Sequence, residues 1–249
     1  MPEAQISRIN EEMSCEQPGL LKRIGWVLTS PGKLMEYLAQ KPRVLFGLIL
    51  AAISTNILYI VRLPLYKEDL KNTLYATNEY LESMVGQSMT AEMVEKNLPT
   101  TVIRSLISAP FTMVFSLLFT TLIFFAILKI MGGQGKYKAY LSVTAYSYVI
   151  PALYILLVIP VSFVTGSLHQ DIPLTSLATL ASADMAGTFL YGILKGLTVP
   201  SIWNSTVMAI GLTTVSKLKK TNVYIVVGVI FIIGLMITGV GEIARKAFM

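Results

Sequence analysis

The sequence offers few side chains that could carry out catalysis. It contains one cysteine, Cys15, and one histidine, His169, among 249 residues. A single cysteine cannot form an internal disulfide, and these two residues are too few soft ligands for a structural zinc site. Catalysis usually requires several His, Cys, Asp, Glu or Lys side chains gathered in one pocket. We therefore expect a protein without a metal, a cofactor or an enzymatic activity.

Three short patterns imitate functional motifs but lack parts that those motifs need. Residues 132–137 contain the Gly-Lys pair of a phosphate-binding loop, yet Ile130 replaces the first glycine and Tyr137 replaces the magnesium-binding Ser or Thr. We expect a flexible turn there. Residues 239–244 imitate a dinucleotide fingerprint without a preceding strand. The glycosylation sequon at 204–206 falls within an apolar run.

The composition is typical of a membrane protein. Hydrophobic residues make up 54% of the chain and charged residues 14%, and the mean hydropathy is +0.65. A soluble domain carries roughly 25% charged residues, so this chain has too few to cover a soluble globule. Residues 1–19 are polar and acidic and do not resemble a cleavable signal, so we expect the first span to direct targeting. The predicted fold is an all-α helical bundle in the membrane.

Five apolar runs approach the length that crosses a bilayer. A helix rises about 1.5 Å per residue and the hydrocarbon is about 30 Å thick, so about 20 residues are needed. The runs are Val44 to Leu63, Ser105 to Leu128, Leu141 to Val164, Val199 to Val215 and Val223 to Val240. The fourth is the shortest and most polar, and whether it crosses fully is left open. The predicted organisation is a cytoplasmic segment 1–43 and a five-span domain 44–249.

Basic residues predict a cytoplasmic N-terminus, because short cytoplasmic loops retain Lys and Arg. The short connections 129–138 and 216–222 are both rich in lysine and lie on one side if two spans separate them. The long loops 64–104 and 165–198, and the tail 241–249, then lie outside. We assign the net charge of +6 to contacts with lipid headgroups, not with nucleic acid. The expected anchors on the cytoplasmic side are Lys22, Arg23, Lys136, Lys138, Lys217, Lys219 and Lys220.

Helical spacing also predicts elements outside the spans. Apolar residues from Leu20 to Leu28 form one stripe of an interfacial helix, and Ser30 and Pro31 suit the cap and first turn of another that ends near Gln40. This second helix either packs on the ends of the spans or binds lipid. We expect one or two helices in the loop 64–104. Residues 174–197 are weakly helical and are expected to lie along the outer interface.

The few polar residues within the spans are candidates for contacts between helices. They cannot bond with water in hydrocarbon, so they should face the bundle interior, and packing is favoured over ligand binding. Arg62 and Arg104 end the first span and precede the second, where long side chains can reach the headgroups. The expected interhelical residues are Asn56, Asn204, Ser205 and Thr206. Close helix contacts, within one chain or between two, are permitted by Gly228, Gly234 and Gly239.

The order of these features resembles the Yip family, the Ypt- and Rab-interacting membrane proteins and their bacterial relatives. The resemblance rests on residues 28–31 (LTSP), on Gly132-Gly133 with residues 137–151 (YKAYLSVTAYSYVIP), and on residues 203–211 with the lysines that follow. It implies five spans and a membrane scaffold or adaptor, linked in eukaryotes to small GTPases. The N-terminal segment lacks the acidic, proline-bearing motif of those relatives, so a small GTPase is not an expected partner. The lysine-bracketed loops resemble the bacterial branch, which lies in the plasma membrane and sometimes accompanies exporters.

Three functions remain open from the sequence. The first is an adaptor that binds the bilayer and another membrane protein, or a second copy of itself. The second is a transporter or permease subunit, for which kinked spans and the polar fourth span would form a path. The third is a lipid-directed enzyme, which would need polar side chains such as Asp184 and His169 to converge at one interface.

Overall fold

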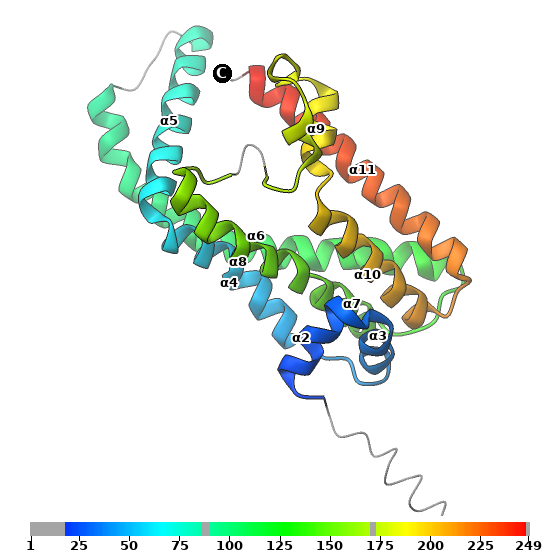
Figure 1. Ribbon diagram of the computed structural model, residues 1–249. Helices are drawn as coiled ribbons and strands as arrows, with labels where there is room; N and C mark the ends of the chain where they lie inside the picture. Colours follow the sequence, from blue (N-terminus) through cyan, green and yellow to red (C-terminus); the bar gives the residue numbers. More distant parts are fainter. Residues whose placement is uncertain (1–17, 86–89, 170–172, 248–249) are drawn as a thin grey trace, which may run out of the picture.

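The computed structural model describes residues 18–85, 90–169 and 173–247 (Figure 1). Within these residues all regular structure is helical, apart from one isolated bridge between Ser176 and Thr198. The α-helices are α2 (Leu20–Thr29), α3 (Pro31–Gln40), α4 (Leu45–Val61), α5 (Leu63–Val85), α6 (Ala91–Ile130), α7 (Tyr137–Ser147), α8 (Val149–Thr165), α9 (Phe189–Gly196), α10 (Val199–Ser216) and α11 (Lys220–Ala247). Short 3-10 turns lie at Leu177–Leu180 and Ala183–Met185. The predicted all-α fold is confirmed.

Three helical segments are each long and apolar enough to cross a membrane: α6, the joined α7 and α8, and α11. A fourth candidate is the pair α4 and α5, which is bent by 91° between them, if it counts as one span. The 17 residues of α4 rise about 26 Å, slightly less than the hydrocarbon thickness. Helix α10 carries the polar residues 204–206. The count of five spans therefore stays a prediction that depends on α4 and α10.

One face of α6 carries a continuous stripe of large apolar side chains. They recur every four residues, and each is more than half exposed: Ile103, Ile107, Phe111, Phe115 and Phe119. Residues four apart lie above one another on a helix, so the stripe is unbroken. An apolar surface of this extent is unfavourable in water, but hydrocarbon solvates it. The stripe is the lipid-facing side of the helix.

The core is built around α7, where every side chain from Ala139 to Ser147 is buried. Helices α3, α4, α6 and α10 all contact α7, and Figure 1 shows α2, α3 and α7 together at one end of the molecule. Gly47 lets α4 approach closely, because a Cβ atom there would lie 2.4 Å from the carbonyl oxygen of Ala145. Close approach through glycine is typical of membrane helices.

The N-terminal helices are part of this core. Leu34, Met35 and Leu38 of α3 are fully buried in the same cluster as α7 and α10. Two alternatives were open for α3, packing on the ends of the spans or binding lipid, and the structure shows that α3 packs on the ends of the longer helices. Pro31 occupies the first turn as expected, but Ser30 makes no side-chain capping hydrogen bond.

A proline explains the break between α7 and α8, and other prolines lie inside continuous helices. Helix α7 ends at Ser147 and α8 restarts at Val149 because Pro151 has no N–H to offer the Ser147 carbonyl. Pro160 lies inside α8, and Pro99 and Pro110 lie inside α6, which changes direction along its length in Figure 1.

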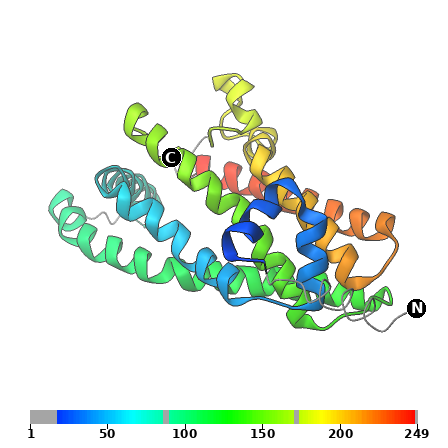
Figure 2. The ribbon, with the colours of Figure 1, turned by 60° about the horizontal axis from the view of Figure 1, so that its bottom comes forward.

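The loop 64–104 is helical almost throughout its described residues. It forms α5 and the first part of α6, so the helix of the second span begins at Ala91. The two helices lie side by side at one end of the molecule (Figure 2), joined by an ion pair between Lys71 and Glu95.

Part of the second long loop, which was expected to be weakly helical, forms the helix α9. This helix packs against the C-terminal half of α11, and Thr238 donates a 3.0 Å hydrogen bond to the carbonyl of Gly192. Both helices have glycine at the contact, since a Cβ on Gly192 would lie 2.6 Å from the Cα of Gly239. Gly239 thus packs within the chain. Helix α11 also continues through Ala247, so most of the expected tail is helical.

Candidate functional site

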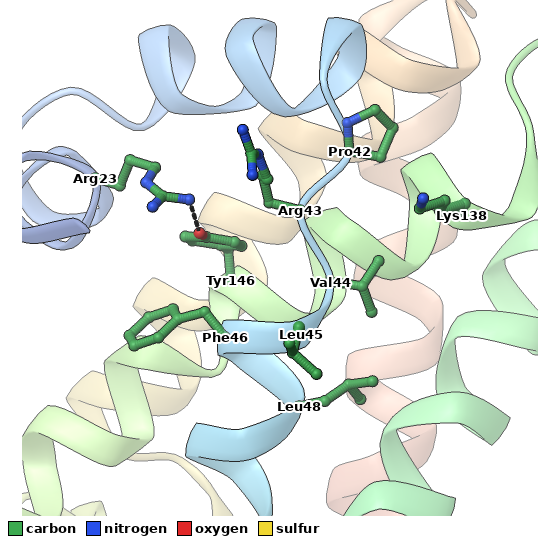
Figure 3. A pocket seen from close by; sticks show the side chains of 9 residues that line it. All are labelled: Arg23, Pro42, Arg43, Val44, Leu45, Phe46, Leu48, Lys138 and Tyr146. Atoms are coloured by element: carbon green, nitrogen blue, oxygen red, sulfur yellow. Dashed lines mark hydrogen bonds between the residues drawn. The ribbon is translucent and has the colours of Figure 1, made fainter. Parts of the chain in front are cut away.

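A basic cavity of about 520 Å³ opens at the end of the molecule formed by α2, α7 and the linker between α3 and α4. Figure 3 shows its lining, which is Arg23, Pro42, Arg43, Val44, Leu45, Phe46, Leu48, Lys138 and Tyr146. Three of these residues are cations, and no carboxylate is among them. The remaining wall is mostly apolar. Such a lining suits a ligand with an anionic group and an apolar part.

Arg23 is held in place by a tyrosine from the centre of the core. Its Nη1 donates a 2.6 Å hydrogen bond to the hydroxyl of Tyr146, and its guanidinium carbon lies 5.8 Å from the centre of that ring (Figure 3). The ring of Phe46 packs 5.7 Å from that of Tyr146 on another side. The Nε of Arg23 is buried and has no hydrogen-bond partner among the described residues. The cation is therefore fixed, with donor capacity to spare.

The linker carrying Arg43 is fastened to α7. The Arg43 amide donates to the Ser142 hydroxyl over 2.9 Å, and this hydroxyl donates back to the Arg43 carbonyl over 3.1 Å. Lys138 comes from the first turn of α7. Two elements far apart in the sequence thus bring cations to one cavity.

A neighbouring cavity of about 390 Å³ shares Pro42 and is lined by two more of the expected anchors, Lys136 and Lys217. The turn beside it is hydrogen-bonded to other parts of the fold. The amide of Gln134 donates to the Ser216 carbonyl over 2.8 Å, and the Tyr140 hydroxyl donates to the Gln134 carbonyl over 2.7 Å. These bonds tie the turn to α10 and to the core.

The seven predicted anchors thus divide into three groups. Arg23 and Lys138 line the first cavity, and Lys136 and Lys217 line the second. The other three lie near the same end without lining either: Lys22, with its Nζ 5.6 Å from the Trp26 ring, and the exposed Lys219 and Lys220.

A second feature is a groove of about 330 Å³ between α6, α10 and α11. Small residues and hydroxyls lie along it, among them Gly196, Ser205, Gly234 and Thr238. Gly234 is exposed, and a Cβ atom built on it would meet nothing within 4 Å. The groove therefore opens toward the surroundings of the bundle.

The predicted interhelical residues behave differently from one another. Asn56 donates from Nδ2 to the Leu106 carbonyl over 2.9 Å and so joins α4 to α6. Ser205 and Thr206 instead donate to carbonyls of their own helix, at Ser201 and Ile202. A Ser or Thr hydroxyl on a helix lies within hydrogen-bonding distance of the carbonyl one turn earlier, which explains why both bonds stay within α10. The Oδ1 atoms of Asn56 and Asn204 are buried without a hydrogen-bond partner among the described residues.

Arg62 corrects the expectation that it reaches lipid headgroups. Its side chain is 0% exposed and lies where α4 meets α5. The guanidinium donates to the carbonyls of Leu58 at 3.1 Å and Leu168 at 2.9 Å, and to the hydroxyl of Ser162. Its partners come from α4, α8 and the segment after α8. The sequence missed this role because the chain segment that buries Arg62 lies about one hundred residues away.

The described residues hold no group of three or more His, Cys, Asp or Glu side chains that could bind a metal. The Nε2 of His169 is 2.7 Å from the hydroxyl of Thr165. Cys15 lies outside the described residues. The arrangement that a lipid-directed enzyme would need, with Asp184 beside His169, has no contact in support of it.

Comparisons with known proteins assign the family. The sequence model of the Yip1 domain matches residues 26–241, most of the chain. The chain is also 28% identical over 211 residues to "Membrane protein YknW" of Bacillus subtilis (strain 168), covering 85% of this chain and 84% of that protein. No solved structure matches significantly. The match over this length confirms the expected resemblance, including that to bacterial relatives, and the chain belongs to the Yip1-domain family of membrane proteins.

Proposed function

We propose that the protein is a non-enzymatic adaptor of the bacterial plasma membrane that binds another membrane protein through one transmembrane helix. The observation that carries the proposal is the groove between α6, α10 and α11. It is lined from the middle of α10 and α11 and from the C-terminal part of α6, and it opens sideways at the exposed Gly234. A sideways opening suits a neighbour in the bilayer better than a solute that passes along the bundle.

The residues that line the groove are suited to contact with another membrane helix. Helices associate in membranes through small residues that let backbones approach, and through hydroxyls that bond across the contact. Gly234 of α11 and Thr120 of α6 supply these features in the groove. An apolar lipid tail would gain little from such residues.

Site-specific crosslinking in native membranes tests this proposal. A photoreactive phenylalanine analogue is placed at Phe231, in the groove, and for comparison at Phe115, on the lipid-facing stripe of α6. We expect Phe231 to capture one integral membrane protein that mass spectrometry can identify, and Phe115 to capture none. Crosslinks only to a second copy, or the same products from both positions, would contradict the adaptor function.

Filling the groove gives a matched pair of variants. Gly234→Leu should abolish the crosslinked partner because the new side chain occupies the groove. Gly228→Leu is the control, since it lies on the same helix, also meets nothing within 4 Å and does not line the groove. A Cβ atom at either position has open space around it, so both variants should accumulate normally.

A transporter subunit is the second candidate, and the unpaired buried Oδ1 atoms of Asn56 and Asn204 favour it. Polar atoms of this kind are satisfied if a water-filled path reaches them. Cysteine is placed at each position in a Cys15→Ser background and probed with a membrane-impermeant thiol reagent. Labelling from both sides of the membrane would support a path. Protection from both sides would exclude it.

A further inference from the structure

We propose that the basic cavity binds the headgroup of an anionic phospholipid, one of whose acyl chains lies in an adjoining apolar slot between α4 and α8. The proposal does not depend on the adaptor function. It rests on the charge of the cavity, on the fixed position of Arg23 and on the continuity between the cavity and the slot.

The charge of the cavity selects the headgroup. Arg23, Arg43 and Lys138 line it without a carboxylate among the lining residues. Arginine donors match phosphate oxygens in a fork, and lysine supplies a point charge. Basic pockets between membrane helices bind lipid headgroups in this manner. A zwitterionic headgroup would bring a cation into the same space and bind less well.

The slot accommodates the apolar part of the ligand. It has about 130 Å³ of space, and Ser54 is its only polar lining residue. Phe46 lines both the slot and the basic cavity, so the two meet at this side chain. From there the slot follows Leu50 and Ile57 of α4 and Leu153 of α8. A free phosphate would leave this slot unused, whereas a phospholipid fills both parts.

The pocket is also preformed. The two hydrogen bonds between Ser142 and Arg43 fix the linker, and Tyr146 fixes Arg23. A fixed site loses little conformational freedom when a ligand binds.

Native mass spectrometry of the full chain in detergent tests the proposal. Dioleoyl phosphatidylglycerol and dioleoyl phosphatidylcholine, which share their acyl chains, are titrated separately. We expect a one-to-one complex with phosphatidylglycerol that survives gentle activation, and at least tenfold weaker binding of phosphatidylcholine. Equal binding of the two lipids would overturn the proposal.

Two double variants with the same change in net charge locate the site. Arg43→Gln with Lys138→Gln removes two cavity cations and should weaken phosphatidylglycerol binding roughly twentyfold, about fivefold per charge. Lys33→Gln with Lys67→Gln removes two exposed lysines that line neither the cavity nor the slot. This control should bind as the wild type does. Equal loss in both variants would show a diffuse electrostatic effect and contradict a defined site.

Competition separates the lipid from a free anion. Glycerol 1-phosphate carries the headgroup chemistry without acyl chains, so millimolar amounts should displace little phosphatidylglycerol. Full displacement would mean that the slot contributes nothing and that the site takes a soluble phosphate. The thermal unfolding midpoint of each variant shows whether it is folded. If the double variant is unstable, the Lys138→Gln single variant, which changes an exposed side chain, is used in its place.

Discussion

At the scale of single residues, two arginines that look alike in the sequence have different roles. Arg62 and Arg104 both flank apolar runs, but Arg62 is buried and makes three hydrogen bonds, whereas Arg104 is exposed. Burying a cation is costly unless its donors are hydrogen-bonded. The guanidinium satisfies its Nε and Nη1 in this way because its donors point in several fixed directions, while its buried Nη2 has no hydrogen-bond partner among the described residues.

Arg62→Lys should therefore destabilise the protein, by about 2 kcal/mol or more, because one ammonium group cannot reach all three acceptors. Arg104→Lys is the control and should change the free energy of unfolding by less than about 0.5 kcal/mol. Thermal or denaturant unfolding of the purified protein in detergent measures both. Equal effects from the two substitutions would show that Arg62 does not hold the junction of α4 and α5.

At the scale of elements, the pair of α9 and α11 depends on the absence of side chains at their contact. We expect Gly192→Ala to separate the helices and to destabilise the protein by about 1–3 kcal/mol, since its Cβ would meet the backbone of Thr238 and Gly239. Gly241→Ala lies in open space on α11 and should be neutral or mildly stabilising. Unfolding in detergent compares the two variants, and a neutral Gly192→Ala would contradict the close contact.

The same pair shows where prediction from the sequence stops. Apolar spacing gives the helices, the all-α class and most of their bounds, because these are local properties. For residues 174–197 it predicts only a weakly helical segment along the outer interface, and it names no partner helix for this segment. In the structure Lys195 meets Glu242 at 3.3 Å, and Glu242 is 3% exposed and also paired with Arg245 at 2.7 Å. A pairing across 47 residues has no signal in one sequence.

The candidate sites show the same limit: the sequence indicates residue types but not which residues come together. Arg23 and Lys138 are both among the anchors predicted from the sequence. Their grouping was not predicted, because the cavity needs Tyr146 to hold Arg23 and Ser142 to hold the linker. Hydrogen bonds between residues that are 99 and 123 positions apart hold these cations in one site. In the sequence alone, the cations indicate only the side of the membrane on which they lie.

At the scale of the whole molecule, the position of the C-terminus tests the number of crossings. Five spans place the two termini on opposite sides, whereas four place them on the same side. We expect alkaline phosphatase fused after Met249 to be active and a fluorescent protein fused there to be dark, as for an exterior C-terminus. A fluorescent protein inserted after Lys136 is the cytoplasmic control. Fluorescence at both positions would mean an even number of spans between Lys136 and Met249 and would remove α10 from the count.

The length of α6 has a mechanical consequence for the whole molecule. Its 40 residues rise about 60 Å, twice the thickness of the hydrocarbon, so roughly half of the helix stands clear of it at a moderate tilt. One hydrogen-bonded rod, flexed at two prolines, thus joins the lipid-embedded half to the half packed on α5. A tilt of the embedded half by about 10° displaces an end 30 Å away by about 5 Å. We expect changes in bilayer thickness, which membrane helices meet by tilting, to move the projecting end laterally.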